Sequence, residues 1–145
     1  MQALIQRVSQ AHVNVAGECI GQIGAGLVIL LCVEHGDDET TAERLLNKIL
    51  KLRIFSDEAG RMNLDVGQVN GGLLIVSQFT LAADVRKGNR PSFTAAADPK
   101  HGKELTDHFI AYARTQHGVV ATGQFGADMQ LTLTNDGPVT IPLSV

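Results

Sequence analysis

Asn135-Asp136-Gly137-Pro138-Val139-Thr140 lies close to the C-terminus, between the apolar runs 129–133 and 139–145. Proline fixes its own φ angle and cannot donate to a sheet ladder, whereas glycine accepts backbone angles that are closed to other residues. Gly137-Pro138 therefore predicts a stiff corner between two strands. Such a corner is an ordinary structural feature, so a functional role for it needs a second signal elsewhere in the chain.

That second signal is the polar segment Ser77-Gln78-Phe79-Thr80, which ends the otherwise apolar run 73–76. Buried strands seldom carry serine, glutamine and threonine together, because each buried polar group needs a hydrogen-bond partner. The segment therefore predicts a functional site at the exit of a buried strand.

Apolar runs predict a chain in which strands dominate. The run 27–33 is apolar throughout, which is typical of a strand buried on both faces. Two helices interrupt the strands: one follows Asp37 or Asp38 and extends over 39–52, and the other starts at Asp98-Pro99 and ends before Gly118. The other predicted strands span 2–15, 18–23, 53–55, 73–78, 119–122, 129–134 and 139–145.

These elements predict one α+β domain over residues 1–145, with mostly antiparallel, curved β-sheets and both helices packed on one side. A chain of 145 residues suits a single core, and no linker or repeat divides it. Polar and apolar residues alternate over the first 15 positions, and no apolar run is long enough to span a bilayer. We therefore expect a cytoplasmic protein that does not bind membranes.

Charge and cysteine content exclude several classes of function. Cys19 and Cys32 stand alone, so neither a disulfide nor a thiolate metal site is expected. A formal net charge of −3 argues against general binding of DNA or RNA, since general binders carry a basic footprint. Arg86, Lys87 and Arg90 form the one local basic cluster, which is either a solvated loop or a contact for nucleic-acid phosphates.

Familiar catalytic constellations are missing from the sequence. No Ser-His-Asp set, paired-carboxylate site or metal-ligand cluster stands out, and the five histidines are scattered, so we expect neither a metal nor a cofactor. Thr80 is a possible nucleophile, but a hydroxyl needs an adjacent base to activate it, and no neighbour in the sequence clearly supplies one.

The segments 77–82 and 135–140 closely resemble the two motifs of the D-aminoacyl-tRNA deacylases, which are homodimeric enzymes that hydrolyse D-amino acids from tRNA. The resemblance covers nearly the full chain, and no motif position departs from the family's pattern. It also includes the flanking segments 3–8, 53–57, 62–64, 90–93 and 125–130.

The resemblance implies a three-layer fold of helix, sheet and sheet, and a proofreading function. Substrates would be the 3′ ends of D-aminoacyl-tRNAs, and glycyl-tRNA mischarged on tRNA(Ala) would be accepted as well. L-Aminoacyl-tRNA would be rejected by Gly137-Pro138, held as a cis peptide and inserted from the other subunit. Arg7 would hold that turn from within its own subunit.

The resemblance also implies a role for each residue of the first motif. Main-chain amides near Phe79 and Thr80 would hold the ester carbonyl oxygen, while the 2′-hydroxyl of the terminal adenosine would perform the acid-base work. Ser77 and Gln78 would position the substrate, Phe79 would wall the pocket, and Met129 would line the adenine site. Two alternatives stay open: Thr80 as a covalent nucleophile, and a non-catalytic RNA-binding or assembly dimer.

Overall fold

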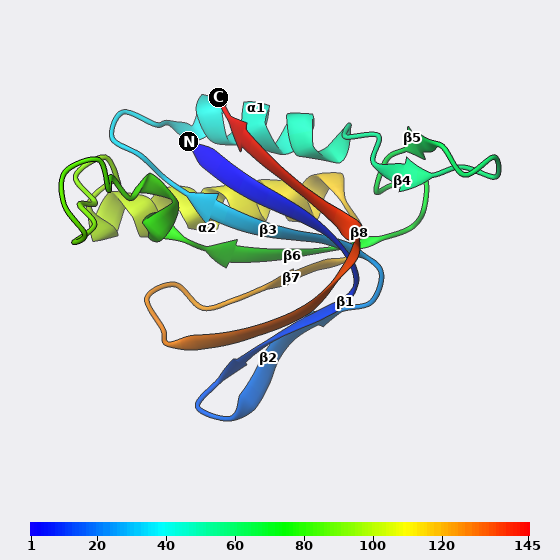
Figure 1. Ribbon diagram of the computed structural model, residues 1–145, viewed down its shortest axis with the longest axis horizontal. Helices are drawn as coiled ribbons and strands as arrows, with labels where there is room; N and C mark the ends of the chain where they lie inside the picture. Colours follow the sequence, from blue (N-terminus) through cyan, green and yellow to red (C-terminus); the bar gives the residue numbers. More distant parts are fainter.

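The computed structural model describes residues 1–145 and shows one large curved sheet with two helices on one face (Figure 1). The strand order in this sheet is β2-β1-β3-β6-β7, and β8 pairs with β1. The α+β prediction is confirmed. The strands are β1 (Gln2–Val15), β2 (Glu18–Ile23), β3 (Gly26–Cys32), β4 (Phe55–Ser56), β5 (Met62–Leu64), β6 (Gly72–Ser77), β7 (Val120–Thr122) and β8 (Met129–Ser144). The helices are α1 (Glu39–Leu50), α2 (Pro99–Gln116) and the short 3-10 helix η1 (Phe79–Ala82).

The sheet is mixed. β1 pairs antiparallel with β2, β3 and β8, as the sequence predicted for most of the sheet. β3 and β6 are parallel, and so are β6 and β7, because the chain crosses from each strand to the next through α1 or α2. The two crossovers place both helices on the same face of the sheet.

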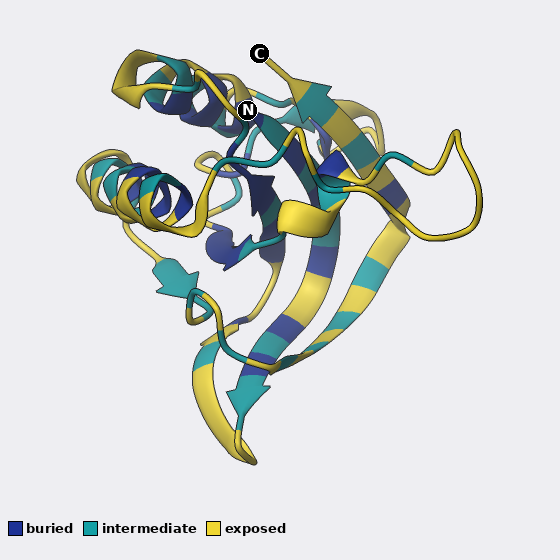
Figure 2. Ribbon diagram, turned by 90° about the vertical axis from the view of Figure 1, so that its left-hand side faces the viewer, coloured by how far each residue is buried: buried dark blue, intermediate teal, exposed yellow.

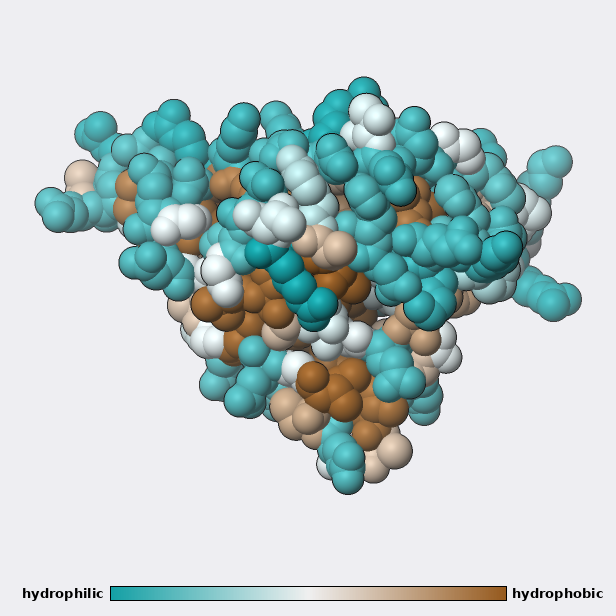
Figure 3. Space-filling view, turned by 180° about the vertical axis from the view of Figure 1, so that it is seen from behind, coloured by the Kyte–Doolittle hydropathy of each residue, from teal (hydrophilic) through white to brown (hydrophobic).

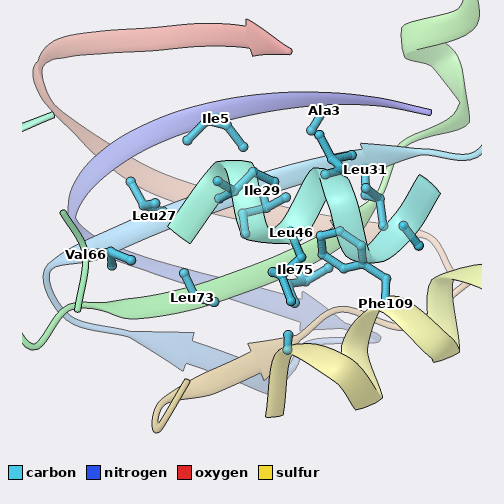
Figure 4. Close-up of a cluster of buried hydrophobic side chains, with 14 of the residues drawn as sticks. Ala3, Ile5, Leu27, Ile29, Leu31, Leu46, Val66, Leu73, Ile75 and Phe109 are labelled. Carbon is cyan, nitrogen blue, oxygen red and sulfur yellow. The ribbon is translucent and has the colours of Figure 1, made fainter. Parts of the chain in front are cut away.

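The central strands are buried on both faces. In β3, Leu27, Ile29 and Leu31 point toward the helices, while Val28 points the other way, as the two-residue repeat of a strand requires. On the helix side these residues join a core cluster with Leu46 and Phe109, among others (Figure 4). The prediction that this run is buried on both faces is confirmed.

A second core cluster fills the concave face of the sheet, where Val8, Val13, Val28, Leu74 and Val76 meet. The sheet curls so far that its edge strands β2 and β7 come into contact. Gly21 permits this approach, since a Cβ atom there would lie 2.5 Å from the carbonyl oxygen of Thr122. The expected helix-sheet-sheet layering is thus built from one continuous curved sheet.

Aspartates cap both long helices. The carboxylate of Asp38 accepts a hydrogen bond from the Thr41 amide at 2.8 Å, and Asp98 accepts bonds from two amides at the start of α2. In Figure 2 both helices turn a buried side toward the sheet and an exposed side to solvent. Neither helix combines the length and apolar composition needed to cross a bilayer.

The prediction that Gly137-Pro138 separates two strands is wrong, because one strand continues through it. β8 runs from Met129 to Ser144 and pairs with β1 on both sides of the motif, with register shifts on either side of Val8. The long β1 offers one continuous edge to both apolar runs, so the chain bulges outward at residues 136–138 without reversing. The Gly137-Pro138 peptide is cis.

Candidate active site

A cavity of about 610 Å³ opens at the C-terminal end of β6. Ser77, Gln78 and Phe79 line it from β6 and η1, and Met129 lines it from the start of β8. The other walls come from β3, the segment before α2, the first turns of α2, and the loop that contains Phe125. Four residues singled out from the sequence therefore meet in one cavity.

The end of β6 is held firmly, which fixes the start of the motif. Ser77 is in register with Leu31 of β3, and the amide of Gln78 donates to the carbonyl oxygen of Leu31 at 2.7 Å. Pairing with β3 thus extends one residue beyond the strand before the chain turns into η1. Both side chains are half-buried at this point.

The turn into η1 leaves main-chain donors without partners. The first N–H groups of a helix have no acceptor within the helix, and the side chain of Gln78 caps none of them. That side chain donates instead to the hydroxyl oxygen of Thr80. The amides of Phe79 and Thr80 are therefore free to donate to a ligand.

Phe79 is large, apolar and 58% exposed. Its ring packs edge-on against Phe93, with ring centroids 5.0 Å apart. This contact fixes the orientation of the Phe79 ring at the rim of the cavity. Phe93, Thr106 and Phe125 line the same cavity, and the sequence did not single them out because each has an ordinary packing role at its position.

A buried thiol lies beneath η1. The Sγ atom of Cys32 is 3.6 Å from the carbonyl oxygen of Phe79. Burial, and next the charge of Glu34, raise the pKa of the Cys32 thiol. A thiol with a raised pKa stays neutral near pH 7, so Cys32 is poorly suited to act as a nucleophile.

No side chain is placed as a general base for Thr80. Its hydroxyl is exposed and receives the Gln78 amide, and no histidine or carboxylate hydrogen-bonds to it. No group of three or more His, Cys, Asp or Glu side chains is arranged to hold a metal ion. The polar side chains that line the cavity are those of Ser77, Gln78 and Thr106, which carry hydroxyl and amide groups.

Gly137 and Pro138 do not line the cavity of their own chain, and both are exposed. Arg7 anchors their segment: its Nε donates to the carbonyl oxygen of Asp136 at 2.8 Å, and its Nη1 donates to the carbonyl oxygen of Ile54. The Arg7 side chain, which is 11% exposed, therefore links the segment around Gly137 to the residue before β4.

Asn135 closes the segment from the other end. Its Oδ1 accepts from the amide of Val139 at 2.7 Å, and its Nδ2 donates to the hydroxyl of Thr140 at 2.9 Å. The sequence analysis quoted Asn135 without assigning it a role. The pattern that could have indicated this role is an asparagine at the start of a Gly-Pro segment, where its side-chain amide can bridge the two ends of the segment.

The basic loop after η1 is partly neutralised. Asp84 and Ser92 pair across its base. The guanidinium of Arg86 bonds to the carboxylate of Asp84 at 2.6 Å, and these hydrogen bonds lower the pKa of Asp84. Lys87 and Arg90 are exposed and form no ion pair.

Two solved structures share this architecture over nearly the whole chain. One, titled "c-Myc DNA Unwinding Element Binding Protein", matches with a TM-score of 0.95 and 39% identity, covering 100% of this chain and 99% of that one. The other, titled "Structural Analysis of a probable eukaryotic D-amino acid tRNA deacylase", has a TM-score of 0.86 and 18% identity, covering 99% and 98% of the two chains. The shared architecture defines the chain as an α+β protein with the fold of these two structures.

Sequence comparison gives the family within that class. The family model described as "D-Tyr-tRNA(Tyr) deacylase" matches residues 4–144. A D-aminoacyl-tRNA deacylase of Variovorax paradoxus is 62% identical over 145 residues, covering 100% of this chain and 99% of the relative. One of Polaromonas sp. is 63% identical over 150 residues, covering 100% and 97%. The chain belongs to the D-aminoacyl-tRNA deacylase family, and it is an enzyme of that hydrolase type.

Proposed function

We propose that this protein hydrolyses the ester bond of D-aminoacyl-tRNAs, releasing the D-amino acid and the tRNA, and leaves L-aminoacyl-tRNAs intact. The observation that carries the proposal is the meeting of Ser77, Gln78, Phe79 and Met129 in one cavity, beside unpaired main-chain donors, in a chain of this family. No cofactor or metal is required by this scheme.

The chemistry divides between the main chain and the substrate. Water attacks the ester carbonyl carbon, and the negative charge that develops on the carbonyl oxygen is stabilised by the amides of Phe79 and Thr80. The 2′-hydroxyl of the terminal adenosine relays the proton of the water to the 3′-oxygen as the ester C–O bond breaks. This route supplies the general acid and base that the cavity walls lack.

The side chains of the motif position the substrate. Ser77 and Gln78 are half-buried polar residues at the cavity wall, suited to hydrogen-bond the adenosine and the aminoacyl group. Phe79 provides an apolar wall, and Met129 provides a polarizable surface for the adenine ring. Orientation of this kind can contribute several kcal/mol to catalysis, roughly 7–11 kcal/mol in the best cases.

Chiral selection requires a second copy of the chain. L- and D-residues differ in the direction that the side chain takes from Cα, so a rigid obstacle in one direction excludes only one enantiomer. We assign that obstacle to Gly137-Pro138 of the other subunit of a homodimer. The assignment is supported by the exposure of both residues, their exclusion from their own cavity, and their anchorage by Arg7.

Partly exposed apolar side chains support the homodimer. Leu131 and Leu133 of the edge strand β8 pack against the second core cluster, while Ile141 and Leu143 pack against the first, and all four are only half-buried. Elsewhere on the molecule, the face opposite to Figure 1 shows apolar surface on its lower half, while its upper half is mostly polar (Figure 3). A second subunit would cover surface of this kind and bring its own Gly137-Pro138 to the neighbouring cavity.

The same geometry sets the substrate range. The D side chain would point out of the cavity, so D-amino acids of varied size would be accepted, and glycine would pass because it has no side chain to collide with the obstacle. Glycyl-tRNA mischarged on tRNA(Ala) would therefore be a substrate too. These properties describe a cytoplasmic proofreading enzyme of translation.

A second function is a non-catalytic dimer that binds nucleic acid. One observation favours it, because the solved structure with 39% identity carries a title that names binding to a DNA element. The net charge of −3 and the position of the polar motif inside a cavity speak against it.

The experiment is the release of free amino acid from D-tyrosyl-tRNA, measured against spontaneous hydrolysis, with and without EDTA. We expect the enzyme to accelerate release equally in both conditions. Release at the spontaneous rate, together with retained tRNA binding, would favour the non-catalytic function. A reversible loss of activity in EDTA would show that a metal takes part.

A further inference from the structure

A second cavity, of about 530 Å³, adjoins the proposed active site. Ser77, Thr106 and Phe125 line both cavities, so the two are neighbours at the end of β6. The second cavity lies between one face of α2 and the end of β7, with Ile20 of β2 contributing to its wall. None of the roles proposed above for the motif residues uses this second cavity.

The two cavities differ in chemistry. Eleven of the 17 residues that line the first are hydrophobic, against four of the 12 that line the second. A polar cavity suits a charged or strongly hydrated ligand better than an amino-acid side chain. Its polar and charged side chains, other than the shared ones, are those of Lys103, Asp107, Arg114, Thr122 and Gln124.

One cation in this cavity is free. The ammonium of Lys103 is paired with the carboxylate of Asp107 at 2.6 Å, so these two charges largely cancel. Arg114 lines the cavity from the last turn of α2, is exposed, and makes neither an ion pair nor a side-chain hydrogen bond. A guanidinium group presents donors in a fork that matches two oxygens of a phosphate.

We propose that the second cavity binds the nucleotide that precedes the terminal adenosine of the tRNA, with Arg114 paired to the phosphodiester between the two nucleotides. This inference rests on the proposed function, which places the aminoacylated adenosine in the first cavity. The RNA strand must leave that cavity carrying one negative charge per nucleotide, and the adjoining cavity offers the free cation at the exit. Ile20, which is 41% exposed, and Ile110 provide apolar surface for the face of the base.

The RNA strand could instead leave the first cavity along the basic loop of Arg86, Lys87 and Arg90, but the structure favours this path less. Arg86 is already bonded to Asp84, and none of Arg86, Lys87 and Arg90 lines either cavity. The loop remains available for phosphates farther along the tRNA.

The test uses two synthetic substrates, D-tyrosyl-adenosine and D-tyrosyl-cytidylyl-adenosine, which differ by one nucleotide and one phosphodiester. We expect the wild-type enzyme to show kcat/KM about tenfold or more higher on the longer substrate, in line with charge-assisted hydrogen bonds to phosphate. In Arg114→Gln the ratio of the two kcat/KM values should fall to near one, mainly through KM, and Arg114→Lys should retain part of it. Arg90→Gln and Lys51→Gln are matched controls that should keep the wild-type ratio.

The outcomes separate this inference from the proposed function. A wild-type enzyme that hydrolyses both substrates at equal efficiency, or an Arg114→Gln variant that keeps the wild-type ratio, would overturn the second cavity as a nucleotide site. Loss of the ratio in Arg90→Gln instead would move the phosphate to the loop and also overturn it. Failure of the wild-type enzyme on both substrates and on D-tyrosyl-tRNA would overturn the proposed function itself. The Arg114 side chain is exposed and makes no hydrogen bond within the protein, so its variants should fold normally. Circular dichroism checks their folding.

Discussion

Thr80 is the residue that separates the two catalytic schemes. If the main-chain amides stabilise the oxyanion, Thr80→Ala removes only a hydroxyl that receives the Gln78 side chain, and kcat should stay within about tenfold of wild type. A covalent nucleophile, in contrast, could not be removed without a loss of several orders of magnitude. Single-turnover kinetics on D-tyrosyl-tRNA measures the difference.

The control for Thr80 lies in the substrate. Replacing the terminal 2′-hydroxyl of the tRNA with hydrogen should reduce the rate more than Thr80→Ala does, because it removes the proposed acid-base group. A correctly folded Thr80→Ala protein with only background activity would instead support the nucleophile scheme.

Substitution of Gly137 should affect the selectivity between D- and L-substrates. Its φ angle is +145°, and a Cβ atom there would lie 2.7 Å from Cγ2 of Val139 and 3.0 Å from Nη2 of Arg7. Gly137→Ala should therefore shift the exposed turn and reduce the ratio of D- to L-tyrosyl-tRNA hydrolysis by tenfold or more. Because the turn is exposed, Tm should change by only a few degrees.

The matched control for this substitution is Gly118→Ala, since a Cβ atom at Gly118 meets nothing within 4 Å. It should leave selectivity unchanged. If Gly137→Ala also left selectivity unchanged, the segment around Gly137 would not be what excludes L-aminoacyl-tRNA.

For single residues, the sequence pointed in two pieces to residues that meet in the first cavity. Ser77, Gln78 and Phe79 could be placed together because they are consecutive at the end of a buried run, and the family resemblance added Met129. Cys32 and Arg114 could not be found, because their relevance depends on which elements pack beside them. Contacts between residues far apart in the chain are not visible in local patterns.

Among the elements, the contact of β2 with β7 is the most sensitive to a single substitution. Gly21→Ala would force a Cβ atom to within 2.5 Å of the Thr122 carbonyl oxygen, and backbone on both sides restricts relaxation. We expect Tm to fall by several degrees, as overpacking costs about 1–3 kcal/mol. Gly24→Ala is the control, because nothing lies within 4 Å of its Cβ position. Equal Tm values for the two variants, by thermal unfolding, would show that the edges of the sheet are not in close contact.

The aspartates that cap the helices should make the stability of the fold depend on pH in the acid range. Hydrogen bonds from Thr41 to Asp38, and from the His101 amide to Asp98, lower the pKa of each carboxyl in the folded state. Groups with a lowered pKa stabilise the fold above their unfolded pKa, which is about 3.9, and that contribution is lost as the pH falls through the folded pKa. Tm should therefore drop on going from pH 6 to pH 3.

Asparagine tests that assignment, since it caps helices without titrating in this range. The double variant Asp38→Asn/Asp98→Asn should lose less Tm between pH 6 and pH 3 than the wild type does. An identical loss in both proteins would assign the acid sensitivity to other carboxylates.

At the element scale, the sequence predicted strands and helices well because apolar periodicity is local. The helix starts at Asp38 and Asp98-Pro99 match the observed caps. The parallel pairing of β3, β6 and β7 and the continuity of β8 could not be predicted, because strand partners are set by the whole fold. η1 was missed because its four residues carry no helical repeat.

For the whole molecule, the proposed homodimer makes each active site a composite of two chains. Ala127→Trp should block the cavity, since Ala127 lines it, while Gly137→Ala should impair the turn. Each variant alone should be defective in selective hydrolysis. After unfolding and refolding of the two together, half of the dimers should be mixed and carry one intact site. D-selective hydrolysis should then return at about a quarter of the number of sites in the wild type.

The control is the same mixture without an exchange step, which should stay defective. Light scattering should give the mass of a dimer throughout. Absence of restoration in mixed dimers of confirmed composition would mean that the turn acts within its own chain.

The most direct measurement compares the hydrolysis of D-tyrosyl-tRNA with that of L-tyrosyl-tRNA made on the same tRNA, under single-turnover conditions. An obstacle in the L direction predicts fast release of D-tyrosine and release of L-tyrosine at the spontaneous rate. Equal rates for the two enantiomers, both above the spontaneous rate, would contradict the account, because the cavity would then be that of a general aminoacyl-ester hydrolase.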